Sequence, residues 1–237
     1  MIKLHQIRIA YGNRCVVRAL DLHIARGEVF ALLGSNGAGK SSTVKAILNF
    51  IDIAAGHIRI DGVPHTQARA RQPLVFIPEK FVPPYYSTGQ QFIDFTLRMH
   101  GLRVAEPAVQ AYCALLDFNA DSLKQPIKSY SKGMCQKLGL IAALATDKPL
   151  YLFDEPMSGL DPAARARLRD VFARLKAEGK TLFFCTHMLA DVEAVCDRVG
   201  ILHGGELVFV GSPAACCEHF NADSLDQAFL AATDAKR

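Results

Sequence analysis

One short stretch constrains the fold of this chain more than any other: a glycine-rich segment between an apolar run and a helix-like run. Residues 29–33 (VFALL) are apolar, residues 34–41 read GSNGAGKS, and residues 43–48 (TVKAIL) continue with helical character. Small residues let successive backbone N–H groups converge on one anion, and the start of a helix adds the positive end of its dipole. The order strand, glycine loop, helix predicts a phosphate-binding P-loop rather than an ordinary glycine turn.

The residue types within this loop indicate which groups would meet a nucleotide. Lys40 can reach the outer phosphates as a point charge, and the Ser41 hydroxyl is placed to ligate the Mg²⁺ that accompanies a nucleoside triphosphate. The rest of the loop would bind phosphate largely through its backbone. The predicted phosphate-binding residues are Gly34, Ser35, Asn36, Gly37, Ala38, Gly39, Lys40 and Ser41.

Two carboxylates follow a second buried strand. Residues 150–153 (LYLF) form an apolar run too short for a typical helix, and Asp154 and Glu155 close it. Ligands of open α/β sheets bind beyond the carboxyl ends of the strands. Beside a P-loop, Asp154 is expected to anchor Mg²⁺ and Glu155 to accept a proton from attacking water.

Three further residues can be interpreted either as structural or as functional. Tyr11, in a Tyr-Gly turn, is either a plain turn residue or an aromatic ring that stacks on a nucleobase. His187, at the end of the apolar run 181–185, is either structural or a contact to the γ-phosphate. Ser131 is placed to cap a helix that runs to about residue 145, and such a cap is also an anion site.

The remaining pattern predicts an α/β fold with an antiparallel entry sheet and a helical insertion. Alternating apolar residues over 2–24 indicate the antiparallel strands, and residues 74–77 a buried strand that ends at a proline. From Glu79 to about Ala145 the pattern is helical, with Phe92, Phe95, Thr96 and Met99 at helical spacing. Residues 199–202 and 207–210 form a predicted hairpin, and the tail from Ser212 is weakly helical.

Composition limits the classes of protein to which the chain can belong. Its 237 residues carry a net charge of +4, and Arg165, Arg167 and Arg169 fall on scattered helix faces as predicted solvated surface, so charge does not indicate nucleic-acid binding. Seven cysteines without a C-x-x-C pair suit neither a disulfide framework nor an ordinary metal site. No apolar run is long enough to span a membrane, and the opening residues lack a signal-peptide pattern, so we expect a cytosolic protein.

Taken together, these segments resemble the nucleotide-binding subunit of ATP-binding cassette (ABC) transporters, over nearly the whole chain and in the order of the family's motifs. The matches are Gly34–Ser42 to the Walker A motif, Leu150–Asp154 to the Walker B strand, Glu155 to the catalytic glutamate, Ser158–Asp161 to the D-loop, His187 to the switch histidine and Tyr11 to the adenine-stacking aromatic residue.

Two positions depart from the family's pattern. The signature motif, usually Leu-Ser-Gly-Gly-Gln, reads Tyr130-Ser131-Lys132-Gly133-Met134 here and keeps the serine and the second glycine. The position after residues 76–78, commonly glutamine, is Glu79, a carboxylate that can still ligate Mg²⁺ but brings negative charge towards the phosphates. The signature variant and the tail 224–230 are more similar to exporters than to importers.

The resemblance implies a fold and a mechanism. The fold is a single P-loop NTPase (ABC ATPase) domain over 1–237, with a nucleotide-binding core of 1–78 and 147–237 and a helical signature subdomain of 79–146. ATP with Mg²⁺, ligated by Ser41, Asp154 and Glu79, would join two copies, or a copy and a homologous subunit, head to tail. Ser131 and Gly133 would meet the γ-phosphate from across that dimer, and Asp161, in the D-loop, would be a further nucleotide-binding residue.

The resemblance also implies partners and a location. Closure would position Glu155 and His187 for hydrolysis, and exposed surface around Phe81 to Gln90 would pass the motion to integral membrane permease subunits. The chain would then work at the inner face of the cell membrane, without nucleic acid. Two alternatives are a soluble cassette ATPase acting on nucleic acid or the ribosome, and a small-molecule kinase; the kinase would leave Ser131 and His187 unexplained.

Overall fold

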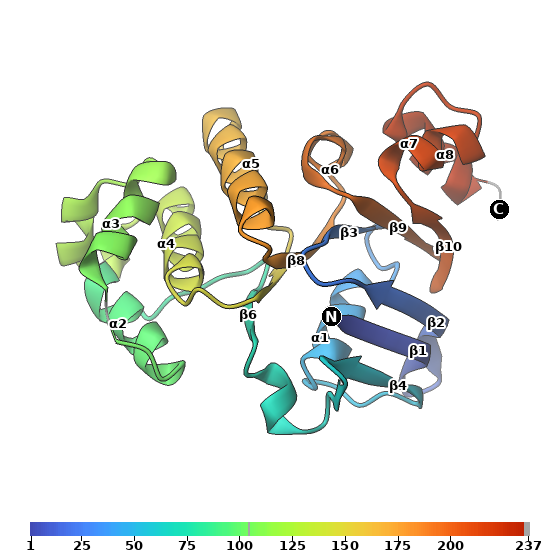
Figure 1. Cartoon of the computed structure of the whole chain (residues 1–237), viewed down its shortest axis with the longest axis horizontal. Coiled ribbons are helices and arrows are strands. Elements are labelled where there is room, and N and C mark those ends of the chain that lie inside the picture. The colour runs from blue at the N-terminus through green and yellow to red at the C-terminus, as the bar shows by residue number, and fades with distance from the viewer. Residues whose placement is uncertain (104, 235–237) are drawn as a thin grey trace.

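The computed structural model describes residues 1–103 and 105–234, which form two β-sheets with helices packed around them (Figure 1). The larger sheet has the strand order β10-β9-β3-β8-β7-β6. Strands β9, β3, β8, β7 and β6 pair in parallel, and β10 pairs antiparallel with β9 at one edge. Its strands are β3 (Val29–Leu33), β6 (Leu74–Ile77), β7 (Leu150–Asp154), β8 (Thr181–Thr186), β9 (Arg198–His203) and β10 (Glu206–Gly211).

The predicted antiparallel entry sheet is present as a four-stranded sheet with the order β2-β1-β4-β5. It joins the two long N-terminal strands to a strand from beyond the P-loop helix, and all of its pairs are antiparallel. Its strands are β1 (Ile2–Tyr11), β2 (Arg14–Ile24), β4 (Ala55–Ile60) and β5 (Val63–Pro64). The β1–β2 turn places Tyr11 opposite Arg14, next to the P-loop.

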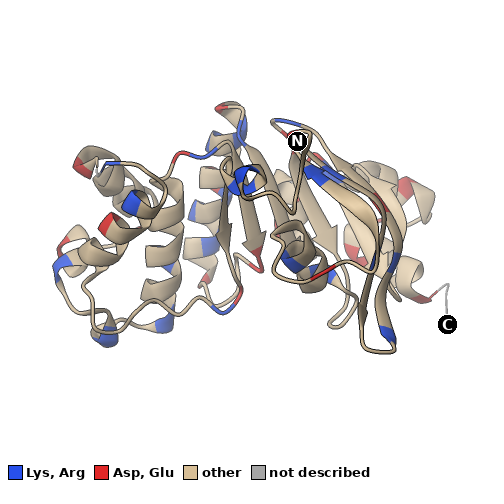
Figure 2. Cartoon of the chain, turned by 90° about the horizontal axis from the view of Figure 1, so that it is seen from below, with Lys and Arg blue, Asp and Glu red and all other residues tan. Residues whose placement is uncertain are grey.

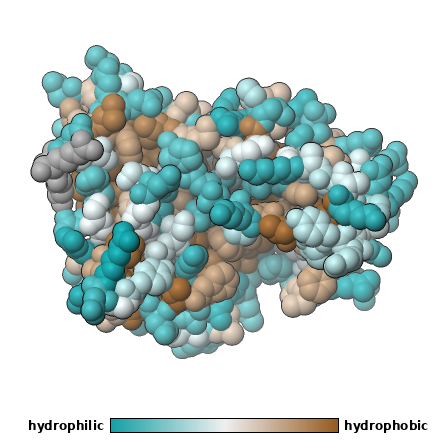
Figure 3. All heavy atoms as spheres, turned by 180° about the vertical axis from the view of Figure 1, so that it is seen from behind, coloured by the Kyte–Doolittle hydropathy of each residue, from teal (hydrophilic) through white to brown (hydrophobic). Residues whose placement is uncertain are grey.

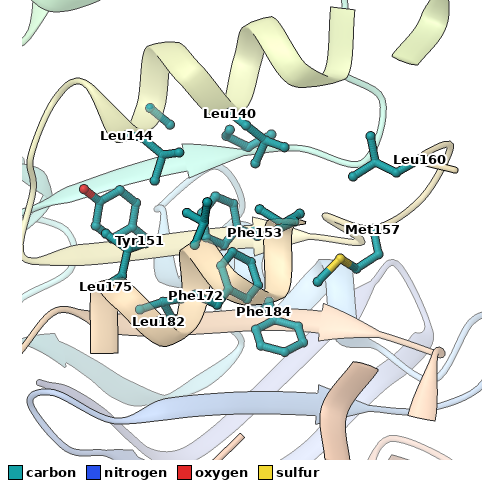
Figure 4. Packing of buried hydrophobic residues seen from close by; sticks show 14 of the residues in the cluster. Leu140, Leu144, Tyr151, Phe153, Met157, Leu160, Phe172, Leu175, Leu182 and Phe184 are labelled. Carbon is teal, nitrogen blue, oxygen red and sulfur yellow. The ribbon is translucent and has the colours of Figure 1, made fainter. Parts of the chain in front are cut away.

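The central strands are buried on both faces, which explains why they read as unbroken apolar runs. Alternate residues enter two apolar clusters, one with α5 and the other with α1 and the smaller sheet. Figure 4 shows the first cluster, where the ring of Phe172 from α5 lies 5.3 Å from that of Phe153 and 5.6 Å from that of Phe184. The core helices are α1 (Lys40–Ile47), α5 (Pro162–Ala177), α6 (Leu189–Val195), α7 (Pro213–His219) and α8 (Leu225–Asp234).

The segment between β6 and β7 is helical, although its first ten residues are not. Residues 79–88 contain no helix or strand, which corrects the prediction of a helical pattern from Glu79. Pro83 and Pro84 lack a backbone N–H and disfavour helical geometry in the residues before them. Its helices are α2 (Gly89–Met99), α3 (Glu106–Leu115) and α4 (Lys132–Leu144), and short 3₁₀ turns span residues 120–124 and 127–129. A further 3₁₀ turn, residues 68–71, precedes β6.

Helix α2 turns a different face to the core from the one that its aromatic residues suggest. Ile93 and Leu97 are its buried large apolar residues, whereas Phe95 is 60% exposed and Met99 71% exposed. The helical spacing is therefore correct, but half of the apolar stripe faces solvent. Tyr85 and Tyr86, in the preceding loop, are exposed as well.

An ion pair joins α5 to α6. Arg169 Nη1 donates to Asp191 Oδ1 at 2.7 Å, and Asp191 is only 3% exposed. Arg169 is therefore not the purely solvated residue that its position on the helix predicted. Because a buried carboxylate needs a partner, this arginine has a structural role.

The surface is mixed in charge and in polarity. In the view of Figure 2, Lys and Arg are spread over the whole chain rather than gathered in one region. On the face shown in Figure 3, hydrophobic atoms gather around the hollow near the middle of the molecule. Within 1–103 and 105–234, no helix combines the length and the apolar character needed to cross a membrane.

Candidate functional site

The P-loop connects β3 to α1, as the sequence predicts, and Gly34 and Gly39 stand where a side chain would collide with neighbouring atoms. A Cβ added to Gly34 would lie 2.5 Å from the carbonyl oxygen of Leu202, and one added to Gly39 would lie 2.8 Å from Val17 Cγ2. Gly39 also has a φ of +111°, which other residues rarely adopt. The loop is thus held tightly between β2 and β9, with its backbone N–H groups at the start of α1.

Lys40 lies folded over the loop that precedes it. Its side chain is buried, and Nζ donates hydrogen bonds to the carbonyl oxygens of Gly34 at 2.6 Å and Ser35 at 3.3 Å. These contacts fix the ammonium group above the loop where an anion would sit. No acidic residue lies in the first turn of α1, so nothing there offsets the attraction for a phosphate.

Asp154 lies at the carboxyl end of β7, beneath Ser41. Burial raises the pKa of Asp154, and the charges of Glu155 and Glu79 raise it further, while a hydrogen bond with Ser41 and the charge of Lys40 lower it. Its Oδ1 atom is buried and has no hydrogen-bond partner within the described residues. An orphaned buried carboxylate oxygen beside a serine hydroxyl suits a hard cation such as Mg²⁺.

Glu155 is held by two contacts from the end of β8. Thr186 Oγ1 donates to Glu155 Oε2 at 3.1 Å, and His187 Nδ1 lies 2.8 Å from Glu155 Oε1. Glu155 is only 7% exposed, and its φ of +52° is in the left-handed region that non-glycine residues adopt at a cost of about 1–3 kcal/mol. Its carboxylate is therefore fixed by backbone and side-chain contacts together.

These groups meet in one cavity of about 500 Å³. The structure brings together most of the predicted nucleotide-site residues there, and Gly34, Ala38 and Asp154 lie in the loop or strand beneath it. The lining residues are Tyr11, Arg14, Val16, Ser35, Asn36, Gly37, Gly39, Lys40, Ser41, Ser42, Glu79, Glu155 and His187.

Arg14 and Val16 line this cavity but were not predicted from the sequence. Arg14 is exposed and pairs across the β1–β2 turn with Tyr11. The antiparallel alternation and the Tyr-Gly turn were signals for this placement, because a residue three positions after Tyr11 returns to its side in a tight hairpin. Arg14 adds a second positive charge to the one that Lys40 contributes.

Three further predicted residues, Ser131, Gly133 and Asp161, lie neither in the lining of the cavity nor in the loop and strand beneath it. Ser131 caps α4, with its Oγ accepting a hydrogen bond from the N–H of Met134 at 3.2 Å. Asp161 caps α5, and hydrogen bonds from backbone N–H groups, that of Ala164 first, lower the pKa of Asp161. Ser131 and Asp161 are exposed, and Gly133 follows Ser131 in the first turn of α4. That Ser131 and Gly133 serve a second copy, and that Asp161 binds nucleotide, stay predictions.

Tyr11 provides a test of base stacking. Its ring is 48% exposed at the mouth of the cavity, and its hydroxyl lies 3.2 Å from Ser42 Oγ. We expect Tyr11→Ala to weaken nucleotide binding by about 1–3 kcal/mol, or roughly 5- to 150-fold in Kd, measured by titration calorimetry with ADP. Tyr11→Phe keeps the ring and should bind within about twofold of the parent chain; equal losses in the two variants would assign the effect to the hydroxyl.

Within residues 1–103 and 105–234, protein side chains alone do not form a metal site. Among the described residues, no group of three or more His, Cys, Asp or Glu side chains could hold a metal ion. A Mg²⁺ ion at Ser41 and Asp154 would therefore also need oxygen ligands from a bound phosphate group, as is usual for this ion. Glu79 lies at the same cavity and close enough to Asp154 to raise its pKa.

Comparison with known proteins gives consistent matches over most of the chain. The model of the family described as ABC transporter matches residues 17–158. An uncharacterised ABC transporter ATP-binding protein of Synechocystis is 37% identical over 84% of this chain, which spans 57% of that relative's length. The lantibiotic transport ATP-binding protein SrtF of Streptococcus pyogenes is 30% identical, with 88% of this chain and 89% of that protein covered.

Solved structures match the whole arrangement of sheets and helices. The ATP-binding subunit of an ABC transporter has a TM-score of 0.87 and 28% identity, and covers 98% of this chain and 99% of its own. A dimeric ATP-binding cassette with bound ADP and phosphate has a TM-score of 0.80 and 20% identity, over 90% of this chain and 98% of its own. The predicted fold, a P-loop NTPase core of the cassette type, is confirmed.

Proposed function

This chain belongs to the ABC transporter family, and from that premise we propose that it binds and hydrolyses ATP to drive export of a substrate through separate membrane subunits. The observation that carries the proposal is the convergence of Lys40, Asp154 and Glu155 beside one cavity at the carboxyl ends of the parallel strands. The names of relatives support a role in transport, as in the lantibiotic transport protein SrtF, and one of them, a Nod factor export protein, supports the direction.

In this proposal the P-loop holds the triphosphate. The backbone N–H groups of the loop and the Lys40 ammonium bind the phosphates, and the Tyr11 ring stacks on the base. The Ser41 hydroxyl and the Asp154 carboxylate would hold Mg²⁺, which when bound neutralises charge on the phosphate oxygens. Arg14, at the cavity rim, adds a further positive charge that favours the anion.

Glu155 is proposed as the general base. A carboxylate fixed by Thr186 and His187 is oriented in advance, so it can accept the proton of a water molecule that attacks the γ-phosphate. The side chain of His187 is 60% exposed, which leaves part of its ring free to reach the phosphate. Ser131, Gly133 and Asp161 would contribute from a second copy, because they lie outside the chain's own cavity.

The helical segment is proposed as the part that meets the membrane subunits. We divide the chain into a nucleotide-binding core, 1–78 and 147–237, and a helical subdomain, 79–146. Tyr86, Phe95 and Met99 expose apolar surface on the loop before α2 and on α2 itself, which supports a protein partner there. Such partners would place the chain at the inner face of the cell membrane.

Affinity purification from membranes solubilised in mild detergent tests this function. We expect a multi-span membrane protein to be retained with the chain, and its reconstitution with the chain in liposomes to stimulate ATP hydrolysis. A matched chain in which Phe95 and Met99 are replaced by serine should fold and bind ATP but retain less of that partner. Retention of RNA or ribosomal protein in place of a membrane protein would contradict the proposal.

Glu79→Gln tests the carboxylate that stands where glutamine is common in the family. Removing a negative charge near the phosphates should tighten binding of Mg²⁺-free ATP by about 0.5–2 kcal/mol, or roughly 2- to 30-fold. Binding of ATP measured in EDTA and in Mg²⁺ separates the two effects of the residue. If affinity in EDTA is unchanged while Mg²⁺ no longer stimulates hydrolysis, Glu79 acts mainly as a metal ligand.

A further inference from the structure

The start of α4 and the loop before α5 lie against each other on the surface of the chain. A Cβ added to Gly133 would lie 3.9 Å from the carbonyl oxygen of Gly159, and one added to Gly159 would lie 3.2 Å from Lys132 Cε. The aliphatic part of Lys132 therefore rests on the bare backbone of Gly159. Gly159 has a φ of +77°, so any other residue there would be strained and would also displace Lys132.

The charge of Lys132 has no opposite charge paired with it in the described part of the chain. Lys132 is exposed, and across residues 1–103 and 105–234 its ammonium has no hydrogen-bond or ion-pair partner. By contrast, Lys137 on the same helix donates to the carbonyl oxygen of Asp117 at 3.0 Å. A lysine at the first position of a helix opposes the helix dipole, and no acidic residue in the first turn of α4 compensates for it.

Lys132 therefore places an unfavourable charge at the start of α4 that no ion pair offsets within the described residues. Conflicts of this kind are expected at functional positions, where a ligand relieves them. The neighbouring polar groups can donate hydrogen bonds, as the Lys132 ammonium can. The Ser131 oxygen accepts the N–H of Met134, so the Ser131 O–H remains free to donate, and the N–H of Gly133 lies in the first turn of α4.

None of these three residues lines the cavity around the chain's own P-loop. We propose that Lys132 is a binding residue for the ATP held on the P-loop of a second copy, with its ammonium on the γ-phosphate beside the Ser131 hydroxyl. The proposal rests on the proposed function, because it requires an ATP-joined dimer. It adds to that function a side-chain cation at a position where the family's usual signature sequence has glycine.

ATP-dependent dimerisation measures this contact. In chains that all carry Glu155→Gln to slow hydrolysis, sedimentation velocity with ATP and Mg²⁺ gives the dimer dissociation constant. Lys132→Gln should weaken the dimer by about a hundredfold, about tenfold at each of its two sites, because hydrogen bonds between charged groups contribute most when desolvated. Lys132→Arg should restore most of the affinity. Lys137→Gln, with the same change in charge on the same helix, should change it less than threefold.

Mixed dimers then decide whether Lys132 acts across the interface. When one copy carries Lys40→Ala and the other carries Lys132→Gln, a contact across the interface puts both lesions in one site and leaves the other site intact. When one copy carries both substitutions and its partner neither, each site has one lesion. Copies that carry neither substitution also form intact homodimers, so only heterodimers are compared, isolated by a different affinity tag on each copy. We expect the first heterodimer to be the tighter one with ATP. Lys132 acting within its own chain would reverse this order.

The outcomes separate this inference from the proposed function. If the Glu155→Gln parent stays monomeric with ATP, the ATP-joined dimer itself is wrong, and the role of Lys132 falls with it. If the parent dimerises and Lys132→Gln dimerises equally well, the dimer stands and only Lys132 is excluded. Binding of ATP to the monomer should be unchanged within about twofold in Lys132→Gln; a larger loss there would also contradict the proposal.

Discussion

Replacing Glu155 by glutamine is expected to leave ATP bound but to lower the rate of hydrolysis by about 10²–10⁴-fold, the usual contribution of a general base. The amide has nearly the same shape, and its oxygen can still accept the hydrogen bond from Thr186, so the local structure should be retained. The amide cannot accept a proton from water. Single-turnover hydrolysis measured with excess enzyme separates this loss from any change in ATP binding.

Glu178→Gln is the matched control. It removes the same charge from an exposed residue at the end of α5, where the carboxylate pairs with Arg174 at 2.9 Å. Hydrolysis by this variant should stay within about twofold of the parent, because a surface ion pair contributes little. Near-normal hydrolysis by Glu155→Gln would assign proton acceptance to another group and remove Glu155 from that role.

Replacing Lys40 by alanine is expected to lower affinity for ATP by roughly a hundredfold or more. The ammonium is held over the loop by the carbonyl oxygens of Gly34 and Ser35, and charge-assisted contacts to phosphate are the strongest polar contacts that the site offers. Titration calorimetry with ATP and with ADP measures the loss, which should be larger for ATP because Lys40 is placed for the outer phosphates.

Lys45→Ala provides the comparison for Lys40→Ala on the same helix. Lys45 is exposed in the last turn of α1, so its removal should leave ATP affinity within about twofold. Thermal melting without nucleotide checks that both variants fold. Unchanged ATP affinity in folded Lys40→Ala would contradict the assignment of the loop as a phosphate site.

Much of the nucleotide-binding core could be predicted because its local patterns agree with the fold. The apolar runs that became β3, β7 and β8 are buried on both faces, so each reads as an unbroken strand bounded by turn or polar residues. The carboxyl ends of parallel strands meet at one edge of a sheet, which brings Glu155 to Thr186 and His187 from 31 or 32 residues away. The helix caps at Ser131 and Asp161 are equally local signals.

The predictions that failed depended on tertiary packing. Spacing can identify α2 as a helix, but only its neighbours determine that Ile93 is buried while Phe95 is exposed. Arg169 resembled surface because its partner, Asp191, lies 22 residues away on another helix. Arg14 was missed because its place at the cavity depends on how the β1–β2 hairpin packs against the P-loop.

The ion pair between Arg169 and Asp191 links two loops to which the proposed function assigns a role. The 158–161 loop leads into α5, and the loop with Thr186 and His187 leads into α6. Each loop is therefore attached to the N-terminus of one of the two helices that the ion pair joins. Since breaking a buried pair leaves an uncompensated charge, α5 and α6 should shift together rather than one at a time. In the proposed dimer, a neighbouring copy that displaced the 158–161 loop would then also displace the loop of Thr186 and His187, and with it the contact between His187 and Glu155.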